Sequence, residues 1–190
     1  MSSVPMNNSI QVRGFARKTM EFEHSKIHDG RGYDVDIEFT LIGTASVYYH
    51  IETGNYNCHL KDFELTTNKP EVKAWFYINP TVAKSTSPQQ VTIFNSDHTS
   101  SNESSLKIYT NSTVTADGTK RKVYYVVGSI GQGQTSAGSQ NAYDNWEFIT
   151  KKNENYLLKI QRIVADGDTT GLLRLKYYDC LLYTSDAADE

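Results

Sequence analysis

Two histidines near the start of the chain have a spacing that a metal site could use. His24 and His28 are four residues apart, and Glu23 and Asp29 flank them. Side chains four positions apart lie close together, one turn apart, on a helix, and the surrounding residues lack the apolar periodicity of a helix. We therefore interpret this group as exposed polar side chains on an arm and expect no metal ion there.

Pairs of carboxylates are a second arrangement that could do chemistry, because two of them can hydrolyse a glycosidic bond. Asp62 and Glu64 form such a pair, but positions two apart share a face of any strand for structural reasons alone. Asp166 and Asp168 begin like a calcium-binding loop, yet the twelfth position holds Tyr177 where that loop needs a glutamate. The chain contains no G-x-S-x-G, phosphate-binding loop or H-E-x-x-H motif. We therefore expect a protein that is not an enzyme and carries no cofactor.

Aromatic side chains are numerous enough to form a sugar-stacking surface, with 13 Tyr and 2 Trp. Tyr143 and Trp146 are the candidates, because they lie at a long Gly-rich loop from Gly128 to Asn145, and loops longer than about 12 residues are often functional. Another group falls within predicted strands, where core packing is expected to account for half of it or more. This group is Tyr48, Tyr49, Trp75, Tyr77, Tyr124, Tyr125, Tyr156 and Tyr177.

The composition indicates which elements must position these side chains. Val, Ile, Thr, Tyr, Phe and Trp make up 65 of the 190 residues, whereas Ala and Leu together make up only 21. The first group suits a pleated, half-buried surface. A helical bundle is therefore excluded, and strands must carry the fold.

Period-two alternation predicts about ten short strands. The clearest is Asp34–Leu41, in which apolar and polar residues alternate at every position. The others are Val47–Glu52, Tyr56–Leu65, Val72–Ile78, Val91–Phe94, Leu106–Tyr109, Lys122–Val127, Trp146–Ile149, Tyr156–Val164 and Gly171–Tyr178. In Tyr56–Leu65 the alternation of apolar residues shifts by one position, which predicts a β-bulge near Lys61 and Asp62. We expect an all-β domain over residues 33–179, a two-sheet antiparallel sandwich of jelly-roll-like topology.

Charge and hydropathy exclude several function classes. The net charge is −3 and the isoelectric point is about 6.0, so we expect no nucleic-acid partner. Lys120-Arg121-Lys122 is interpreted as exposed charge in a turn. No run of about 18 apolar residues and no secretory signal are present, so we expect no membrane association and synthesis in the cytoplasm.

The last eleven residues, CLLYTSDAADE from Cys180 to Glu190, resemble the translation of a transposon adapter used to prepare sequencing libraries. The adapter encodes all eleven residues without a mismatch. We therefore interpret residues 180–190 as a non-native tail and expect the natural end at or beyond Asp179. Cys58 is then the native thiol, and no internal disulfide is expected.

Residues 1–32 are the least regular part of the chain and are expected to form an extended arm. Phe15, Met20, Phe22 and Ile27 are apolar, but their spacing fits neither a strand nor a helix. Such side chains must be buried against something. We expect them to contact a neighbouring copy in a homo-oligomer; packing on their own sandwich is the alternative.

From Thr40 to Asp179, about three quarters of the chain resembles small β-sandwich virion proteins of tailed phages. The resemblance lies in the order of several short motifs. They are Gly54 with His59-Leu60-Lys61, Pro80-Thr81-Val82, Phe94-Asn95-Ser96, the segment Thr113 to Thr119, the loop from Gly128 to Gly138, Trp146 to Ile149, Asn155 to Leu158, and Leu175 to Tyr178. Residues 1–33 depart from the family pattern, and the family supplies no catalytic residues to transfer.

The resemblance implies a non-enzymatic structural protein of a phage virion, made in the cytoplasm of the bacterial host. Such a protein would be a capsid decoration, a head fibre or a tail component. Its partners would be other virion proteins and copies of itself, with a trimer favoured by analogy with phage fibres and decorations. The alternative is a carbohydrate- or receptor-binding module that recognises a glycan on the host surface.

Overall fold

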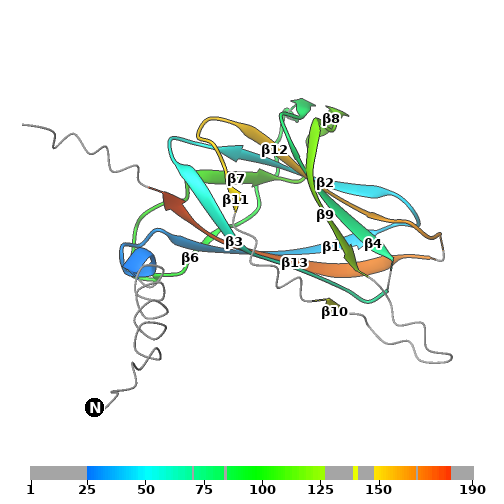
Figure 1. Ribbon diagram of the computed structural model, residues 1–190, viewed down its shortest axis with the longest axis horizontal. Helices are drawn as coiled ribbons and strands as arrows, with labels where there is room; N and C mark the ends of the chain where they lie inside the picture. The colour runs from blue at the N-terminus through cyan, green and yellow to red at the C-terminus, as the bar shows by residue number, and fades with distance from the viewer. Residues whose placement is uncertain are drawn as a thin grey trace, which may run out of the picture.

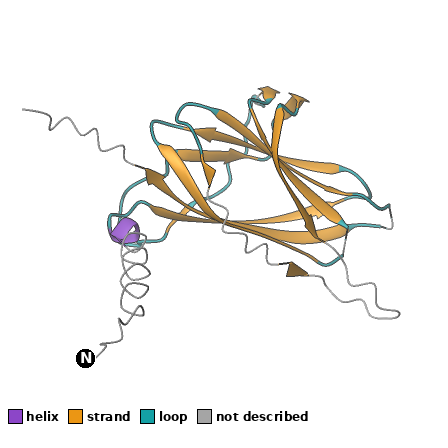
Figure 2. Cartoon of the chain, viewed as in Figure 1, coloured by secondary structure: helices purple, strands orange, loops and turns teal. Residues whose placement is uncertain are grey.

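The computed structural model describes residues 25–69, 71–83, 85–126, 148–165 and 167–180, together with the backbone of residues 139–140. These residues form β-strands and one helical turn at residues 25–28 (Figures 1 and 2). The strands are β1 (Gly32–Leu41), β2 (Ser46–Thr53), β3 (Asn57–Thr67), β4 (Val72–Ile78), β5 (Thr81–Ala83), β6 (Phe94–Asn95), β7 (Leu106–Tyr109), β8 (Thr113–Ala116), β9 (Thr119–Val126), β10 (Ser139–Gln140), β11 (Phe148–Ile149), β12 (Asn155–Arg162) and β13 (Thr169–Cys180).

The strands form two packed antiparallel sheets and a small third one. Sheet A has the order β10-β3-β13-β1-β6, with β11 also paired to β3. Sheet B has the order β7-β2-β12-β4-β9, and β5 pairs with β8 in the two-stranded sheet. Sheet A lies below sheet B in the view of Figure 1.

The connections between the sheets follow a jelly roll. Among the described strands, the chain crosses from one sheet to the other at β1–β2, β2–β3, β3–β4, β6–β7, β11–β12 and β12–β13. The first and last strands, β1 and β13, are neighbours in sheet A, and β2 and β12 are neighbours in sheet B. Strands from the two ends of the chain are thus nested in pairs, which is the wiring of a jelly roll. The predicted fold, an all-β two-sheet antiparallel sandwich of jelly-roll type, is confirmed.

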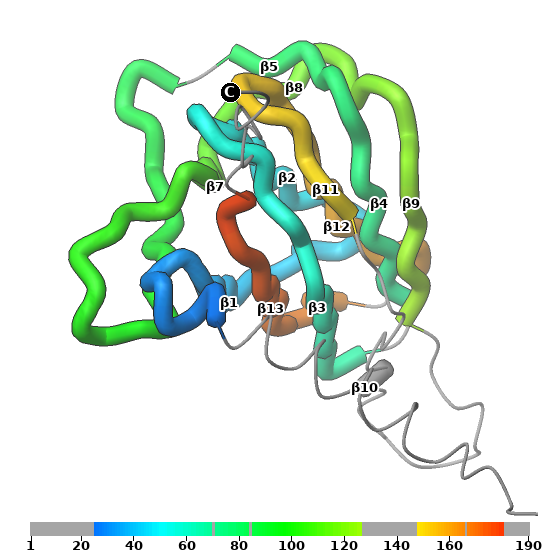
Figure 3. Tube along the Cα trace, turned by 60° about the vertical axis from the view of Figure 1, so that its left-hand side comes forward, coloured from blue at the N-terminus to red at the C-terminus, as the bar shows by residue number. Residues whose placement is uncertain are grey.

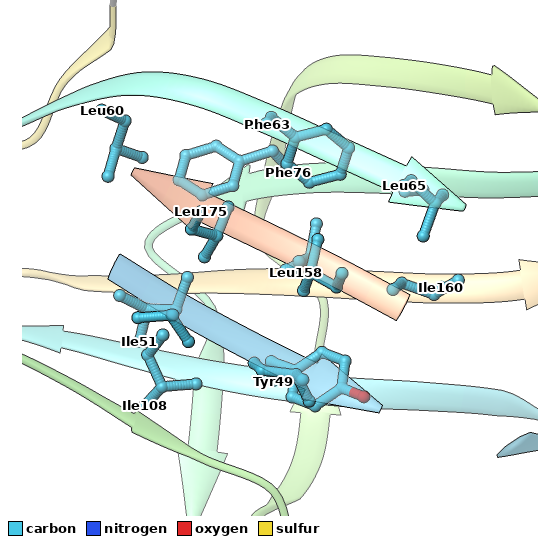
Figure 4. Packing of buried hydrophobic residues seen from close by; sticks show 14 of the residues in the cluster. Tyr49, Ile51, Leu60, Phe63, Leu65, Phe76, Ile108, Leu158, Ile160 and Leu175 are labelled. Atoms are coloured by element: carbon cyan, nitrogen blue, oxygen red, sulfur yellow. The ribbon is translucent and has the colours of Figure 1, made fainter. Parts of the chain in front are cut away.

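Alternation along the strands gives each sheet one buried face. In β1 the apolar side chains from Val35 to Leu41 are buried, whereas Asp36 and Glu38 between them are exposed. Figure 4 shows side chains from the two sheets meeting in one cluster, among them Tyr49, Ile51, Leu60, Phe63, Leu65, Phe76, Leu158 and Leu175. Burying one such apolar side chain is worth about 1.5–3 kcal/mol, so this cluster is the main source of stability.

The predicted bulge in β3 is confirmed. Asp62 pairs with Lys176 and Leu60 pairs with Tyr177, so Lys61 has no partner on β13. The extra residue changes the phase of the alternation, and both Leu60 before it and Phe63 after it therefore point into the core.

The β4–β9 pair continues beyond sheet B as the β5–β8 ribbon, which Figure 3 shows at the top of the molecule. Asn79 between β4 and β5 has a φ of 53°, and Gly118 between β8 and β9 has a φ of 88°. A Cβ atom on Gly118 would lie 2.4 Å from the carbonyl oxygen of Ile78, so only glycine fits this close approach. These two residues bend the ribbon out of the sheet.

Local structure differs from the sequence predictions at several points. Residues 25–28 form a helical turn instead of extended chain, and Gly30 ends it with a φ of 64°. The short strands β5, β8 and β10 were not expected, and the Val91–Phe94 run is a strand only at its end, in β6. In the described parts of the chain, no helix is long and apolar enough to cross a membrane.

Candidate functional site

The eight tyrosines and tryptophans singled out above within predicted strands divide equally between the core and the outside of sheet B. The buried half is Tyr49, Tyr124, Tyr156 and Tyr177. The other half is Tyr48, Trp75, Tyr77 and Tyr125, at the alternate positions of β2, β4 and β9. The expectation that core packing takes half of this group or more is therefore met at its lower limit.

The outward rings lie in cross-strand rows with lysines. One row is Tyr48, Lys159, Trp75 and Val123, on β2, β12, β4 and β9 in turn. Lys159 Nζ lies 5.4 Å from the centre of the Tyr48 ring and 6.0 Å from that of Trp75. In the next row Lys73 Nζ lies 5.2 Å from the centre of the Tyr125 ring. Cation–π contacts of this kind contribute about 0.5–1 kcal/mol each at exposed sites.

The residues Lys120, Arg121 and Lys122 belong to β9, an edge strand of sheet B, and not to a turn. Lys120 pairs with the outward residue Tyr77 and extends the positive charge of the outer face, and Arg121 falls where the register shifts. Charged side chains on an edge strand also oppose pairing with foreign strands. We call this surface the basic aromatic face and define it by Tyr48, Lys73, Trp75, Lys120, Val123, Tyr125 and Lys159.

Asp117, at the bend of the ribbon, is an acidic neighbour of the basic aromatic face. Its carboxylate accepts a hydrogen bond from Lys159 Nζ at 3.0 Å. Burial lowers the pKa of Lys159, but hydrogen bonds and charge from Asp117 and Tyr48 outweigh it, and the net shift is upward. Burial, and then the charge of Asp117, raise the pKa of Tyr77. Asp117 therefore fastens the bent ribbon to the outer face of sheet B.

The outer face of sheet A has the opposite charge. Arg174 lies in the centre of one row, with its Nε 3.1 Å from Asp36 Oδ1 and its Nη1 3.7 Å from Glu64 Oε2. The next row places Lys176 between Asp34 and Asp62. The paired positions of these strands hold five acids and two bases, and Lys26 and Lys61 line a hollow together with Asp34 and Asp62. We call this outer surface the acidic face: Asp34, Asp36, Glu38, Asp62, Glu64, Arg174 and Lys176.

A buried polar cluster closes one end of the sandwich. Asp179 is 1% exposed; its Oδ1 accepts the thiol hydrogen of Cys58 at 3.3 Å and its Oδ2 accepts the backbone N–H of Ser105 at 3.1 Å. Thr150 Oγ1 accepts the backbone N–H of Cys58 at 2.9 Å. Burial raises the pKa of Asp179, and burial together with the Asp179 charge raises that of Cys58. A thiol held in its protonated form is a poor nucleophile, and the hydrogen bonds of the cluster join β3 and β13 to the segments at Ser105 and Thr150.

The structure describes one of the six residues predicted to make contacts. Ile27 lies in the helical turn, 39% exposed, and its Cγ1 is 3.1 Å from where a Cβ of Gly32 would stand. Ile27 thus lies beside the first residue of β1, on its own sandwich. The other five lie outside the described residues: Phe15, Met20, Phe22, Tyr143 and Trp146.

The structure also shows parts of the two side-chain pairs considered as a metal site and as a catalytic site. His28 is exposed, and His24 lies outside the described residues; within the described ranges, no group of three His, Cys, Asp or Glu could hold a metal ion. Asp62 and Glu64 do share a face, as two strand residues must, and Glu64 lies beside Arg174.

Sequence reasoning missed the buried polar cluster and the charge of the two outer faces. Positions 58, 105, 150 and 179 carry no common motif, and only the fold brings them together. The faces did leave a signal, because the outward residues of β1 are mostly acidic and those of β4 are lysine and aromatic.

No protein-family model, curated protein or solved structure matches the chain. The described fold and the chemistry of its surfaces are therefore the basis for proposing a function. Both outer faces offer groups suited to binding: ammonium groups and rings on sheet B, carboxylates on sheet A.

Proposed function

We propose that this protein is a non-enzymatic structural component of a bacteriophage particle, as a capsid decoration, head fibre or tail part. The jelly-roll wiring carries the proposal, because this architecture recurs in viral capsid domains. The resemblance of residues 40–179 to phage virion proteins adds to it. This support is an analogy of fold and sequence, since one fold can serve many functions.

The edges of the sandwich suit a part that is repeated many times in one particle. β6, β10 and β11, which flank the long strands of sheet A, are two residues long, and β9 at the edge of sheet B carries Lys120, Arg121 and Lys122. Short and charged edges suppress uncontrolled strand pairing between copies. Assembly would then depend on faces and on the arm, with Phe15, Met20, Phe22 and Ile27 as contact residues of a homo-oligomer, a trimer being favoured.

Mass spectrometry and immunogold labelling of purified particles test this function. We expect peptides of residues 33–179 in particles banded on a density gradient, at a copy number that repeats from one preparation to the next. Particles treated with nuclease and high salt serve as the control for adsorbed protein. Absence of the chain from such particles would contradict the proposal.

A carbohydrate- or receptor-binding module is the second candidate, and the basic aromatic face favours it. Tyr125 is 37% exposed, and Trp75 and Tyr48 are half-buried beside lysines that could bind hydroxyl or carboxylate groups. A glycan array probed with the full chain and with Trp75→Ala tests this function. A hit lost in Trp75→Ala and retained in Tyr56→Ala would support it, and an empty array would reject it.

A further inference from the structure

We propose that copies of this protein stack face to face, with the basic aromatic face of one copy against the acidic face of the next. This contact goes beyond the virion role, because it names the two surfaces that meet and does not depend on where the protein is found. Both surfaces belong to the same chain.

The basic aromatic face has positive charges that the protein does not neutralise itself. Among the described residues, Lys73, Lys120 and Arg121 have no carboxylate within ion-pair distance, and Lys159 is paired with Asp117. Lys73 and Lys120 are thus left over on the outside of sheet B, and Arg121 adds a third cation on the edge strand β9. They call for an anionic partner of similar extent.

The acidic face provides that partner. Arg174 is shared between Asp36 and Glu64, and Glu38 and Asp62 form no ion pair among the described residues. Glu38 and Asp62 are both exposed, on β1 and β3, with β13 between them. The unneutralised carboxylates therefore lie along the two strands that flank a central basic one.

The geometry of the two faces allows them to meet. Each is an array of rows across neighbouring antiparallel strands, and strands in any sheet are about 4.8 Å apart. Sheets pack face to face at about 10 Å when their side chains interdigitate. Val123 and Tyr125, which are 46% and 37% exposed, provide apolar area, and half-buried Leu172 lies in the row that contains Glu38 on the acidic face. On the basic aromatic face Val123 and Tyr125 lie on the edge strand β9, and Lys159 and Lys73 lie on the inner strands β12 and β4, so charge would meet charge near the centre of the contact.

The symmetry of this contact follows from the positions of the faces. They lie on opposite sides of the sandwich, since one is the outside of sheet A and the other the outside of sheet B (Figure 1). A contact between two different surfaces is heterologous, and it leaves one face of each kind free on the growing assembly. Stacking therefore continues from copy to copy and needs no part of the arm.

Light scattering of the full chain over a range of protein and salt concentrations is the first test. Screening extends over about 30 Å at 0.01 M salt and about 3 Å at 1 M. We expect the weight-average mass to rise with protein concentration at low salt and to fall by roughly half or more at high salt. A mass that does not change with salt at any protein concentration would overturn the proposal.

A charge swap is the second test. The variant Lys73→Glu/Lys120→Glu makes both faces acidic, and the variant Glu38→Lys/Asp62→Lys makes both faces basic. We expect neither variant to stack alone and an equimolar mixture to recover the salt-dependent mass of the wild type. Lys152→Glu, an exposed charge reversal away from both faces, is the matched control and should stack like the wild type.

A folding control and two further outcomes complete the test of the stacking contact. Circular dichroism establishes that each variant is folded, and the salt dependence of the wild type needs no variant. Salt-dependent growth that both double variants retain would place the contact elsewhere and refute the proposal. Oligogalacturonate, an acidic glycan, is the probe for the other occupant of the basic aromatic face. If Lys73→Glu/Lys120→Glu loses oligogalacturonate binding that the wild type has, and its self-association is unchanged, the basic aromatic face is assigned to an acidic glycan instead.

Discussion

The outer faces of sheets A and B have the same strand alternation but are held together by different contacts. On the acidic face Arg174 bridges two carboxylates, and its side chain is 48% exposed. On the basic aromatic face Lys159 is 19% exposed and lies between two rings and Asp117. An ion pair screened by water contributes little, whereas one partly enclosed by aromatic rings contributes more. Side chains that point away from the core are thus not equivalent, and sheet B should lose more stability when its outer face is cut back.

The largest effect is expected in the core that both faces share, where Leu158→Ala gives the reference value. Leu158 is 1% exposed in β12 and packs between the sheets. Its truncation should lower the free energy of unfolding by about 2–5 kcal/mol, measured by urea denaturation. A loss below about 1 kcal/mol would mean that the sheets are not packed as described.

Alternation predicted most of the fold because it reports directly which side chains are buried. β4 and β7 have the predicted bounds, β1, β2, β12 and β13 differ from them by a few residues, and the bulge at Lys61 followed from the slip in phase. The topology could also be inferred, since many short strands with tight turns favour a sandwich. The ribbon strands β5 and β8 escaped detection, because three or four residues are too few to show a period.

The candidate site was much less predictable than the fold. Alternation says that Tyr48 and Trp75 point to one face, but it does not say which face is the core. That choice depends on the register between β2, β12 and β4, which aligns Lys159 with both rings. The same holds for Cys58 and Asp179, which are 121 positions apart in the chain and meet only through the pairing of β3 with β13.

Trp75→Ala is the next largest change and tests the basic aromatic face. The variant removes an aromatic ring that contacts Lys159 and packs in a row with Val123. We expect a loss of about 1–2 kcal/mol, from cross-strand packing and the cation–π contact together. Tyr56→Ala is the matched control, because Tyr56 is 37% exposed with Arg31 at 5.3 Å from its ring centre, yet lies outside the strands. Equal losses of unfolding free energy in both variants would show that the basic aromatic face stabilises the protein no more than an exposed ring outside the strands does.

Asp179→Asn tests the buried cluster through pH. Burial raises the pKa of Asp179, so the folded state binds its proton more tightly than the unfolded state does. The stability linked to this proton is fully present below the ordinary Asp pKa of about 3.9 and is lost as pH rises through the folded value. We expect the wild type to lose stability relative to Asp179→Asn over this window, in urea titrations at successive pH values.

Asp97→Asn is the control of opposite sign for that experiment. Hydrogen bonds from the Thr99 hydroxyl and backbone N–H lower the pKa of Asp97. Its contribution is present above the ordinary Asp pKa and is lost as pH falls through the lowered value. The same direction of change in both variants would show that the pH dependence has another origin.

The smallest effect is expected on the acidic face, with Arg174→Ala. The side chains of Arg174, Asp36 and Glu64 are all about a third or more exposed, so water and salt screen their attraction, and such pairs contribute about 0.2–1 kcal/mol. Removing Arg174 also leaves Asp36 and Glu64 without a cation between them, and their mutual repulsion adds a part that salt can suppress. We therefore expect a loss of about 0.5 kcal/mol at low salt that vanishes at about 1 M salt. A double-mutant cycle with Asp36→Ala isolates the pair, and a coupling above that of Lys159 with Asp117 would reverse the ranking of the two faces.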